Sequence, residues 1–334
     1  MKGIIQIMKK IITIVLAVCC LCSLSACQKT EQNMSFSANT NEIMDGMHTL
    51  YAANTEGYAF GIDTRPSYGV DEDGIFELSS AKDTMYFHIE SAGDSKRQLA
   101  VQIFIDYVQA PIIIDGTTYD TFYINADDKF SKEYAFRFAE EIDTTKNHKI
   151  LAILTAYSDI LMAKQDVQAV ATSTDTSLCF DGILSFSPNN TLVEPLFNMN
   201  QPTELYEDNF NDGFLLNTAT KNIRSIPDNT ITASPNETVT LKYHVGGGAA
   251  KESRDNSLIL VNIANKQTSI NEQAYYYIDT EPDKISYGDF SIQAPSEPGM
   301  YEITAWSVPN PFAPNITGCN INIPMAMRFT LEVK

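Results

Sequence analysis

The chain has 334 residues, of which 44% are hydrophobic, so it is long enough to bury more than one hydrophobic core. Its 42 acidic side chains outnumber its 23 basic ones and give a formal net charge of -19 at pH 7. A surface of this charge repels phosphate backbones and anionic lipid headgroups, which argues against nucleic acid as a partner and against adhesion of the whole surface to a membrane.

The first 26 residues have the features of a signal peptide. Lys2, Lys9 and Lys10 precede an apolar run over residues 11–22, which has the length of a signal sequence and is short for a membrane span. Small residues follow this run at once. We therefore expect the chain to be exported and residues 1–26 to be removed.

The end of this segment, Leu24-Ser25-Ala26-Cys27, resembles the lipobox of bacterial lipoproteins. The resemblance implies a diacylglyceryl thioether on Cys27, cleavage before it, and an extracytoplasmic protein anchored to a bacterial membrane, either the cell membrane or, if the cell has one, the outer membrane. Two or more acyl chains hold a protein on a bilayer, because each buried methylene contributes about 0.8 kcal/mol. The alternative is an ordinary secretory signal with an accidental cysteine.

Two further cysteines, Cys179 and Cys319, follow Cys27 in the chain. No Cys-x-x-Cys pair or Cys/His cluster accompanies them, so the sequence indicates no disulfide framework, zinc site or redox chemistry, and we expect no cofactor. We expect two buried thiols that pack as small apolar side chains, with one bridge between them as the alternative.

The segment 27–56 follows the predicted cleavage point. Residues 28–40 are rich in Gln, Asn, Ser and Thr, which indicates a flexible tether. Apolar residues at helical spacing between 43 and 51 predict a short helix after it.

From residue 57 the hydrophobic period changes to two. Short β-branched and aromatic runs, separated by Gly, Asp, Asn and Pro, predict a first antiparallel β-sandwich over 57–187 and a second over 230–334. The expected strands are 85–89, 99–107, 119–124, 134–138 and 149–157 in the first domain, and 238–245, 258–264, 274–278, 289–292, 301–308 and 327–333 in the second. Residues 158–176 are expected to form a short helix or lid.

The two series of strands read as an internal repeat. Residues 123–131 parallel 277–286 with one insertion, and 148–152 parallel 301–305. This similarity predicts two copies of one domain, with chance similarity among short β segments as the alternative.

In the second copy, Glu297-Pro298-Gly299-Met300-Tyr301 resembles the corner between strands E and F of immunoglobulin-like and fibronectin-like sandwiches. In that corner a Tyr hydroxyl bonds back to the corner backbone. His148 takes the same position in the first copy. The resemblance implies an all-β fold of two tandem antiparallel immunoglobulin-like β-sandwich domains, without the disulfide of antibody domains, and it implies no activity.

The connecting segment 188–229 is too long and too apolar for a simple linker. Asp212-Gly213, flanked by aromatic and apolar residues, predicts a tight hairpin turn within it. We expect the segment to pack against one or both domains.

No familiar catalytic motif occurs in the chain. The Gly246-Gly247-Gly248 run lies between expected strands, which favours a turn over a phosphate site. Acidic clusters at 71–74 and 207–213 carry oxygen ligands of the kind that calcium prefers but lack EF-hand spacing, so solvated turns are favoured and no metal site is predicted. Isolated histidines favour structural hydrogen bonds over ligand or general-base roles; they are His48, His88, His148 and His244.

The loop before the last strand contains the candidate binding residues, Pro309, Pro311, Phe312 and Pro314. An uncharged, proline-stiffened aromatic loop suits contact with a sugar face or a partner groove, because proline lowers the ordering cost of contact. The alternative is a loop that folds back over its own domain. The single tryptophan, Trp306, is expected in the core.

The sequence favours a non-catalytic surface module that binds an unknown protein, peptide or glycan, or that takes part in envelope assembly, because the fold presents loops and no reaction motif is visible. The alternative is an enzyme of unfamiliar type, a hydrolase built from carboxylates that folding brings together. A cleft in which several carboxylates converge would favour the enzyme.

Overall fold

The computed structural model describes residues 52–53, 58–64, 74–91, 97–126, 130–164, 177–207, 213–218, 230–247, 255–313, 323–326 and 328–334. Their strands belong to one compact unit, Met47–Lys334. The predicted signal peptide, Cys27, the tether and the expected short helix lie outside the described residues.

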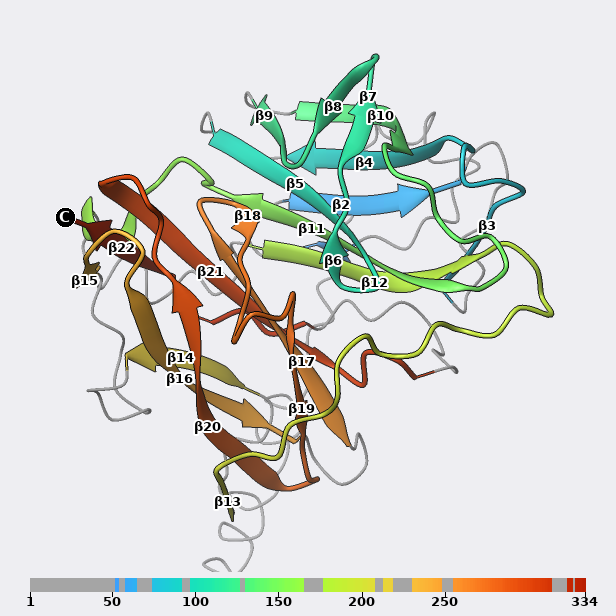
Figure 1. Cartoon of the computed structure of the whole chain (residues 1–334). Coiled ribbons are helices and arrows are strands. Elements are labelled where there is room, and N and C mark those ends of the chain that lie inside the picture. Colours follow the sequence, from blue (N-terminus) through green and yellow to red (C-terminus); the bar gives the residue numbers. More distant parts are fainter. Residues whose placement is uncertain are drawn as a thin grey trace, which may run out of the picture. The chain divides into compact units, whose positions relative to one another are not determined.

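The first sandwich consists of two sheets (Figure 1). One has the strand order β1-β2-β4-β10-β7-β8, and the other has the order β3-β12-β11-β5-β6 with β9 paired to β5. Its strands are β1 (Ala52–Ala53), β2 (Tyr58–Asp63), β3 (Ile75–Glu77), β4 (Met85–Ser91), β5 (Arg97–Ile105), β6 (Val108–Gln109), β7 (Ile112–Ile114), β8 (Thr117–Tyr119), β9 (Phe122–Ala126), β10 (Phe130–Phe138), β11 (His148–Ala156) and β12 (Ser177–Ser185). Buried residues such as Phe60, Phe87 and Phe136 fill the space between the sheets.

The second sandwich has the sheets β13-β20-β16-β14 and β15-β22-β21-β17-β18, with β19 paired to β17. Its strands are β13 (Glu204–Glu207), β14 (Phe214–Thr218), β15 (Thr230–Ala233), β16 (Thr238–Gly246), β17 (Asn256–Ile263), β18 (Lys266–Gln267), β19 (Tyr276–Asp279), β20 (Lys284–Gln293), β21 (Gly299–Pro309) and β22 (Phe329–Val333). Leu241, Phe290 and Leu331 are among the buried residues of its core.

The two sandwiches share most of their topology, as the internal repeat predicts. They differ at one edge, where β7 and β8 lie beside β10 in the first and β13 lies beside β20 in the second. In each, an N-terminal strand runs parallel to the last strand: β3 pairs with β12 and β15 with β22. The pairing of β4 with β10 recurs as β16 with β20, so that Met85 opposite Phe136 corresponds to Leu241 opposite Phe290. The all-β immunoglobulin-like fold is therefore present twice.

The predicted tyrosine corner is present. Tyr301 Oη donates a hydrogen bond of 2.8 Å to the Glu297 carbonyl. In the first copy, His148 Nε2 lies 2.8 Å from the Asp143 carbonyl, so the imidazole ties down the equivalent corner. Tyr301 and His148 thus each bond to a backbone carbonyl of the corner, one through a hydroxyl and the other through an imidazole.

The hairpin predicted at Asp212-Gly213 lies largely outside the described residues, which exclude 208–212. The flanking strands β13 and β14 do not pair with each other, because β13 pairs with β20 and β14 with β16, at opposite edges of one sheet. Each of these two strands pairs with a strand of the second sandwich and not with its neighbour in the sequence. The segment 188–229 therefore contributes two edge strands to the second sandwich.

The strand expected over 119–124 is also interrupted. Asp120 and Thr121 separate β8, which pairs with β7, from β9, which pairs with β5. The chain thus crosses from one sheet to the other within what reads locally as a single strand.

A third apolar cluster joins the sheet of β5, β11 and β12 to the sheet of β17 and β21. Strand β11 is consequently buried along its whole length. The β5–β6 and β17–β18 turns, each with two residues of positive φ, also meet: Gln109 N donates to Gln267 Oε1 over 2.6 Å, and Gln267 N donates to Gln109 Oε1 over 2.7 Å. Equivalent faces of the two copies therefore contact each other reciprocally, as in an isologous dimer.

The expected helix or lid at 158–176 is one turn of 3-10 helix, η1 (Met162–Lys164), in the part that the structure describes. A buried ion pair holds it: Arg328 Nε lies 3.2 Å from Glu302 Oε1, and Met162 N donates to Glu302 Oε2 over 3.0 Å. Within the described ranges, no helix is long and apolar enough to cross a membrane.

Candidate functional site

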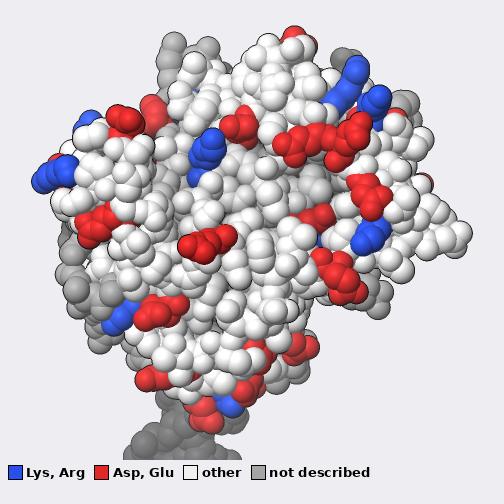
Figure 2. Space-filling model, viewed as in Figure 1, with Lys and Arg blue, Asp and Glu red and all other residues white. Residues whose placement is uncertain are grey.

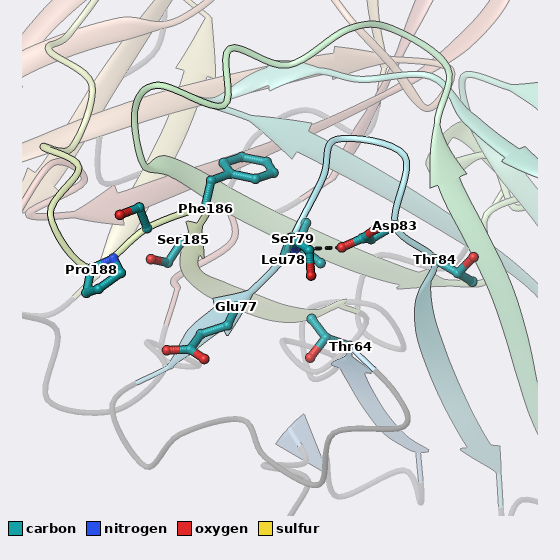
Figure 3. Close-up of a pocket in the computed structure, with 10 residues that line it drawn as sticks. Thr64, Glu77, Leu78, Ser79, Asp83, Thr84, Ser185, Phe186 and Pro188 are labelled. Atoms are coloured by element: carbon teal, nitrogen blue, oxygen red, sulfur yellow. Dashed lines mark hydrogen bonds between the residues drawn. The ribbon is translucent and has the colours of Figure 1, made fainter.

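A pocket of about 640 Å³ opens at one end of the first sandwich (Figure 3). It lies where β2 ends, where the β3–β4 turn begins and where β12 ends. Its volume falls within the range of roughly 300–1,000 Å³ that is typical of small-molecule sites. The lining residues are Thr64, Glu77, Leu78, Ser79, Asp83, Thr84, Ser185, Phe186, Ser187 and Pro188.

One wall of the pocket is a turn that Asp83 closes. The Asp83 carboxylate accepts hydrogen bonds from the backbone N–H groups of Ser79, over 2.6 Å, and Ser80, over 3.0 Å. The backbone of Leu78 donates to the Ser185 carbonyl over 2.9 Å, which joins this wall to β12. The turn is therefore fixed against the strand that forms the opposite side.

Gly182 allows these two walls to come together. A Cβ at this position would lie 2.7 Å from both the Gly74 carbonyl oxygen and a Phe76 ring carbon. Strand β3 can begin its parallel pairing with β12 at this distance only because residue 182 has no side chain.

The pocket lining is rich in hydroxyl groups and carries two carboxylates. Thr64, Ser79, Thr84, Ser185 and Ser187 can each donate and accept hydrogen bonds, whereas ionised Glu77 and Asp83 only accept. Phe186 and Pro188 add apolar surface. No His, Cys or Lys is among the described residues of this lining.

A second pocket, of about 240 Å³, surrounds His148. Its lining includes Asp106, Glu140, Glu141 and Asp143, so it is the place where carboxyl-bearing residues gather. Apolar residues, including Ile105, Phe138 and Leu196, form the rest of its wall.

Most polar groups of this second pocket already hold the corner together. His148 Nδ1 lies 2.6 Å from Asp106 Oδ2, and Lys149 N donates to Asp106 Oδ1 over 2.9 Å. Asp143 Oδ1 accepts from Thr145 N and Oγ1. Burial favours the neutral imidazole, but hydrogen bonds to Asp106 and to the Asp143 carbonyl raise the pKa of His148 above 6.5. His148 is thus engaged at both ring nitrogens and has none left to act as a base.

The candidate binding loop folds back on the protein. Phe312 is only partly exposed and packs edge-on against Tyr107, with ring centroids 5.3 Å apart, and against Tyr277, at 5.8 Å. Pro311 is buried and its carbonyl accepts a 2.6 Å hydrogen bond from Tyr107 Oη. The loop thus folds back on the protein, as the alternative has it, but it covers the contact with the first sandwich as well as its own domain. Pro309 ends β21, and Pro314 lies outside the described residues.

The other residues considered in the sequence analysis are either buried, in contact with a polar neighbour, or outside the described residues. Trp306 is fully buried, as expected, and Cys179 is a free buried thiol. His88 lies 3.2 Å from Glu90, and His244 lies 3.3 Å from the Tyr206 hydroxyl. Cys319, His48, Asp71 to Asp73 and Asp208 to Asp212 lie outside the described residues. Among the described residues, no group of three His, Cys, Asp or Glu could hold a metal ion.

The residues of the larger pocket were not singled out in the sequence. Glu77, Thr84 and Ser185 belong to three separate strands or turns, and no motif links them. The only local signal is the run Ser79-Ser80-Ala81-Lys82-Asp83, which has the composition of a turn. On the face in Figure 2, acidic side chains predominate over basic ones and are interspersed with uncharged residues.

No protein-family model and no curated protein sequence matches the chain. Among solved structures, the CARDB domain of the PF1109 protein from Pyrococcus furiosus, in complex with di-metal ions, is similar over 42% of this chain and 98% of its own, at 15% identity and a TM-score of 0.24. The periplasmic chaperone SfaE matches over 83% and 100%, at 12% identity and a TM-score of 0.22. The C-terminal domain of the AgI/II polypeptide BspA from Streptococcus agalactiae matches over 81% and 99%, at 9% identity and a TM-score of 0.23.

Proposed function

We propose that this chain is an extracytoplasmic lipoprotein, anchored through lipid on Cys27, and that it binds a hydroxyl-rich ligand, a glycan, in the pocket beside Glu77 without converting it. The lipobox resemblance supports the anchor. The observation that carries the binding role is the pocket lining, which combines several hydroxyls, two carboxylates and a phenyl ring.

The lining determines the class of ligand. Sugar hydroxyls both donate and accept hydrogen bonds, so they can pair with Ser and Thr hydroxyls and donate to Glu77. Phe186 adds apolar surface to the lining, and its ring packs edge-on against His148 with centroids 6.3 Å apart. Because the charged lining residues Glu77 and Asp83 are both acidic, neutral or amine-bearing sugars fit and phosphorylated or uronic sugars are repelled.

The runner-up function, a hydrolase, draws its support from the acidic residues around His148. Its groups are, however, committed to structure: Asp106 accepts two hydrogen bonds, Asp143 accepts two, and His148 bonds through both nitrogens. Only Glu140 and Glu141 remain there, both exposed. Binding is therefore the better-supported function.

The anchor is tested with the variant Cys27→Ser. It is expected to lose incorporation of a radiolabelled or alkyne-labelled fatty acid and to leave the membrane pellet, because the thioether has no sulfur on which to form. Unchanged labelling of Cys27→Ser would refute the anchor.

Ligand binding is tested with an array of neutral, amine-bearing and acidic oligosaccharides. We expect retention of neutral and amine-bearing sugars and weaker binding, by about tenfold, in Glu77→Gln, since a hydrogen bond to a charged group contributes roughly 1.5–3 kcal/mol. Glu204→Gln is the matched control, because Glu204 is an exposed glutamate on β13 of the other sandwich. Equal affinities in the two variants would contradict this use of the pocket.

A further inference from the structure

A lysine and an aspartate are buried together on neighbouring strands of the first sandwich. Lys149 lies on β11 opposite Ile183, and Asp181 lies on β12 opposite Leu151, so the two side chains are diagonal neighbours. Their side chains are 0% and 2% exposed, and Lys149 Nζ lies 3.0 Å from Asp181 Oδ2.

The ionic form of this pair is poorly satisfied. An ammonium has three N–H groups to donate. Among the residues that the structure describes, Asp181 Oδ2, at 3.0 Å, is the one polar partner of Lys149 Nζ, so at least two of its three N–H groups have no acceptor. Two buried charges require good hydrogen bonds to offset their desolvation, and here those bonds are lacking on the lysine.

The aspartate has a proton-carrying partner on its other oxygen. Tyr107 Oη lies 3.0 Å from Asp181 Oδ1 and 2.6 Å from the Pro311 carbonyl, so its one proton can be donated to either oxygen. Burial raises the pKa of the Asp181 carboxyl by more than the neighbouring Lys149 and Tyr107 lower it. Phe104, Leu151 and other members of the buried cluster surround the group and exclude water.

We propose that Lys149 and Asp181 form an intramolecular isopeptide bond. A proton passes from the ammonium to the carboxylate, which gives a neutral amine and a neutral carboxylic acid. The net charge of the pair stays at zero. The amine nitrogen then forms a bond to Cγ of Asp181, and the bond from Cγ to Oδ1 breaks. The departing oxygen leaves as water with two protons. One is the acid proton, and the other comes from the nitrogen and is relayed to Oδ1 by the Tyr107 hydroxyl, which ends with its own proton restored.

The products suit this site better than the reactants. The amide buries no charge and leaves one N–H and one carbonyl where three N–H groups and a carboxylate were. The two side chains are held on adjacent strands, so the reaction benefits from a high effective concentration. The bond would cross-link β11 to β12. Unlike a disulfide, it needs no oxidant, and the described cysteine of this sandwich, Cys179, is a free thiol.

The test is mass spectrometry of the full chain extracted from membranes and digested with trypsin. We expect a cross-linked pair of peptides, one containing Lys149 and the other Asp181, with a mass lower by one water than their sum. Lys266 and Asp120 are the internal control, because this pair is 3.6 Å apart but 73% and 55% exposed, so their peptides should be linear. Linear peptides with unmodified Lys149 and Asp181 would overturn the proposal.

Two variants test the assignment of groups. Lys149→Met should abolish the cross-linked species. Tyr107→Phe keeps the ring and removes the hydroxyl, so it should leave a large fraction of the chain unlinked. Full cross-linking in Tyr107→Phe would overturn the role of Tyr107, and the digest of the unmodified chain decides the bond itself even if a variant fails to fold.

Discussion

Replacement of Phe312 by alanine is expected to destabilise the protein. The ring is partly buried against Tyr107, Tyr275 and Tyr277, with centroids 5.3, 6.2 and 5.8 Å away. Truncation of a fully buried Phe costs about 3–5 kcal/mol. Because this ring keeps some exposure, we expect a loss of about 2–3 kcal/mol, which lowers Tm by roughly 4–10 °C in a protein of this size.

Thermal unfolding of Phe312→Ala measures this loss, with Leu196→Ala as the control. Leu196 is 63% exposed, and its backbone N–H donates to Tyr275 Oη, a bond that alanine retains. The control should therefore change stability by no more than about 0.5 kcal/mol. If Phe312→Ala melts at the same temperature as the control, the ring does not plug the interface, and the loop returns as a candidate contact surface.

Three further changes have defined outcomes. The pKa of His148 is raised in the folded protein, so its protonation stabilises the fold fully below about pH 6.5, and this stabilisation is lost as pH rises through the folded pKa. The variant His148→Gln should flatten this part of the curve of Tm against pH. Glu302→Gln leaves Arg328 buried without its counter-charge and should cost about 3–5 kcal/mol in urea unfolding. Gly247→Ala should lower Tm, since its Cβ would lie 1.8 Å from the Glu281 carbonyl oxygen.

Local patterns were sufficient for most of the expected strands and for the repeat. The alternation of apolar and polar residues has the period of a strand whatever surrounds it, so the expected segments at 85–89, 134–138 and 301–308 lie within β4, β10 and β21. The corner at Tyr301 was equally readable, because its hydrogen bond spans only four residues. Such features depend on neighbours in sequence.

Pairing partners and sites depend on residues that are distant in sequence. Strands β13 and β14 come close together in the chain, yet β13 pairs with β20 and β14 with β16, at opposite edges of one sheet. The loop around Phe312 has the composition of a contact loop, but Tyr107 of the other sandwich packs against the Phe312 ring. The sequence by itself therefore determined the elements and their duplication. Only the tertiary structure decided which side chains meet, because Lys149 and Asp181, like the residues of the two pockets, are brought together by strand pairing and packing and by no shared motif.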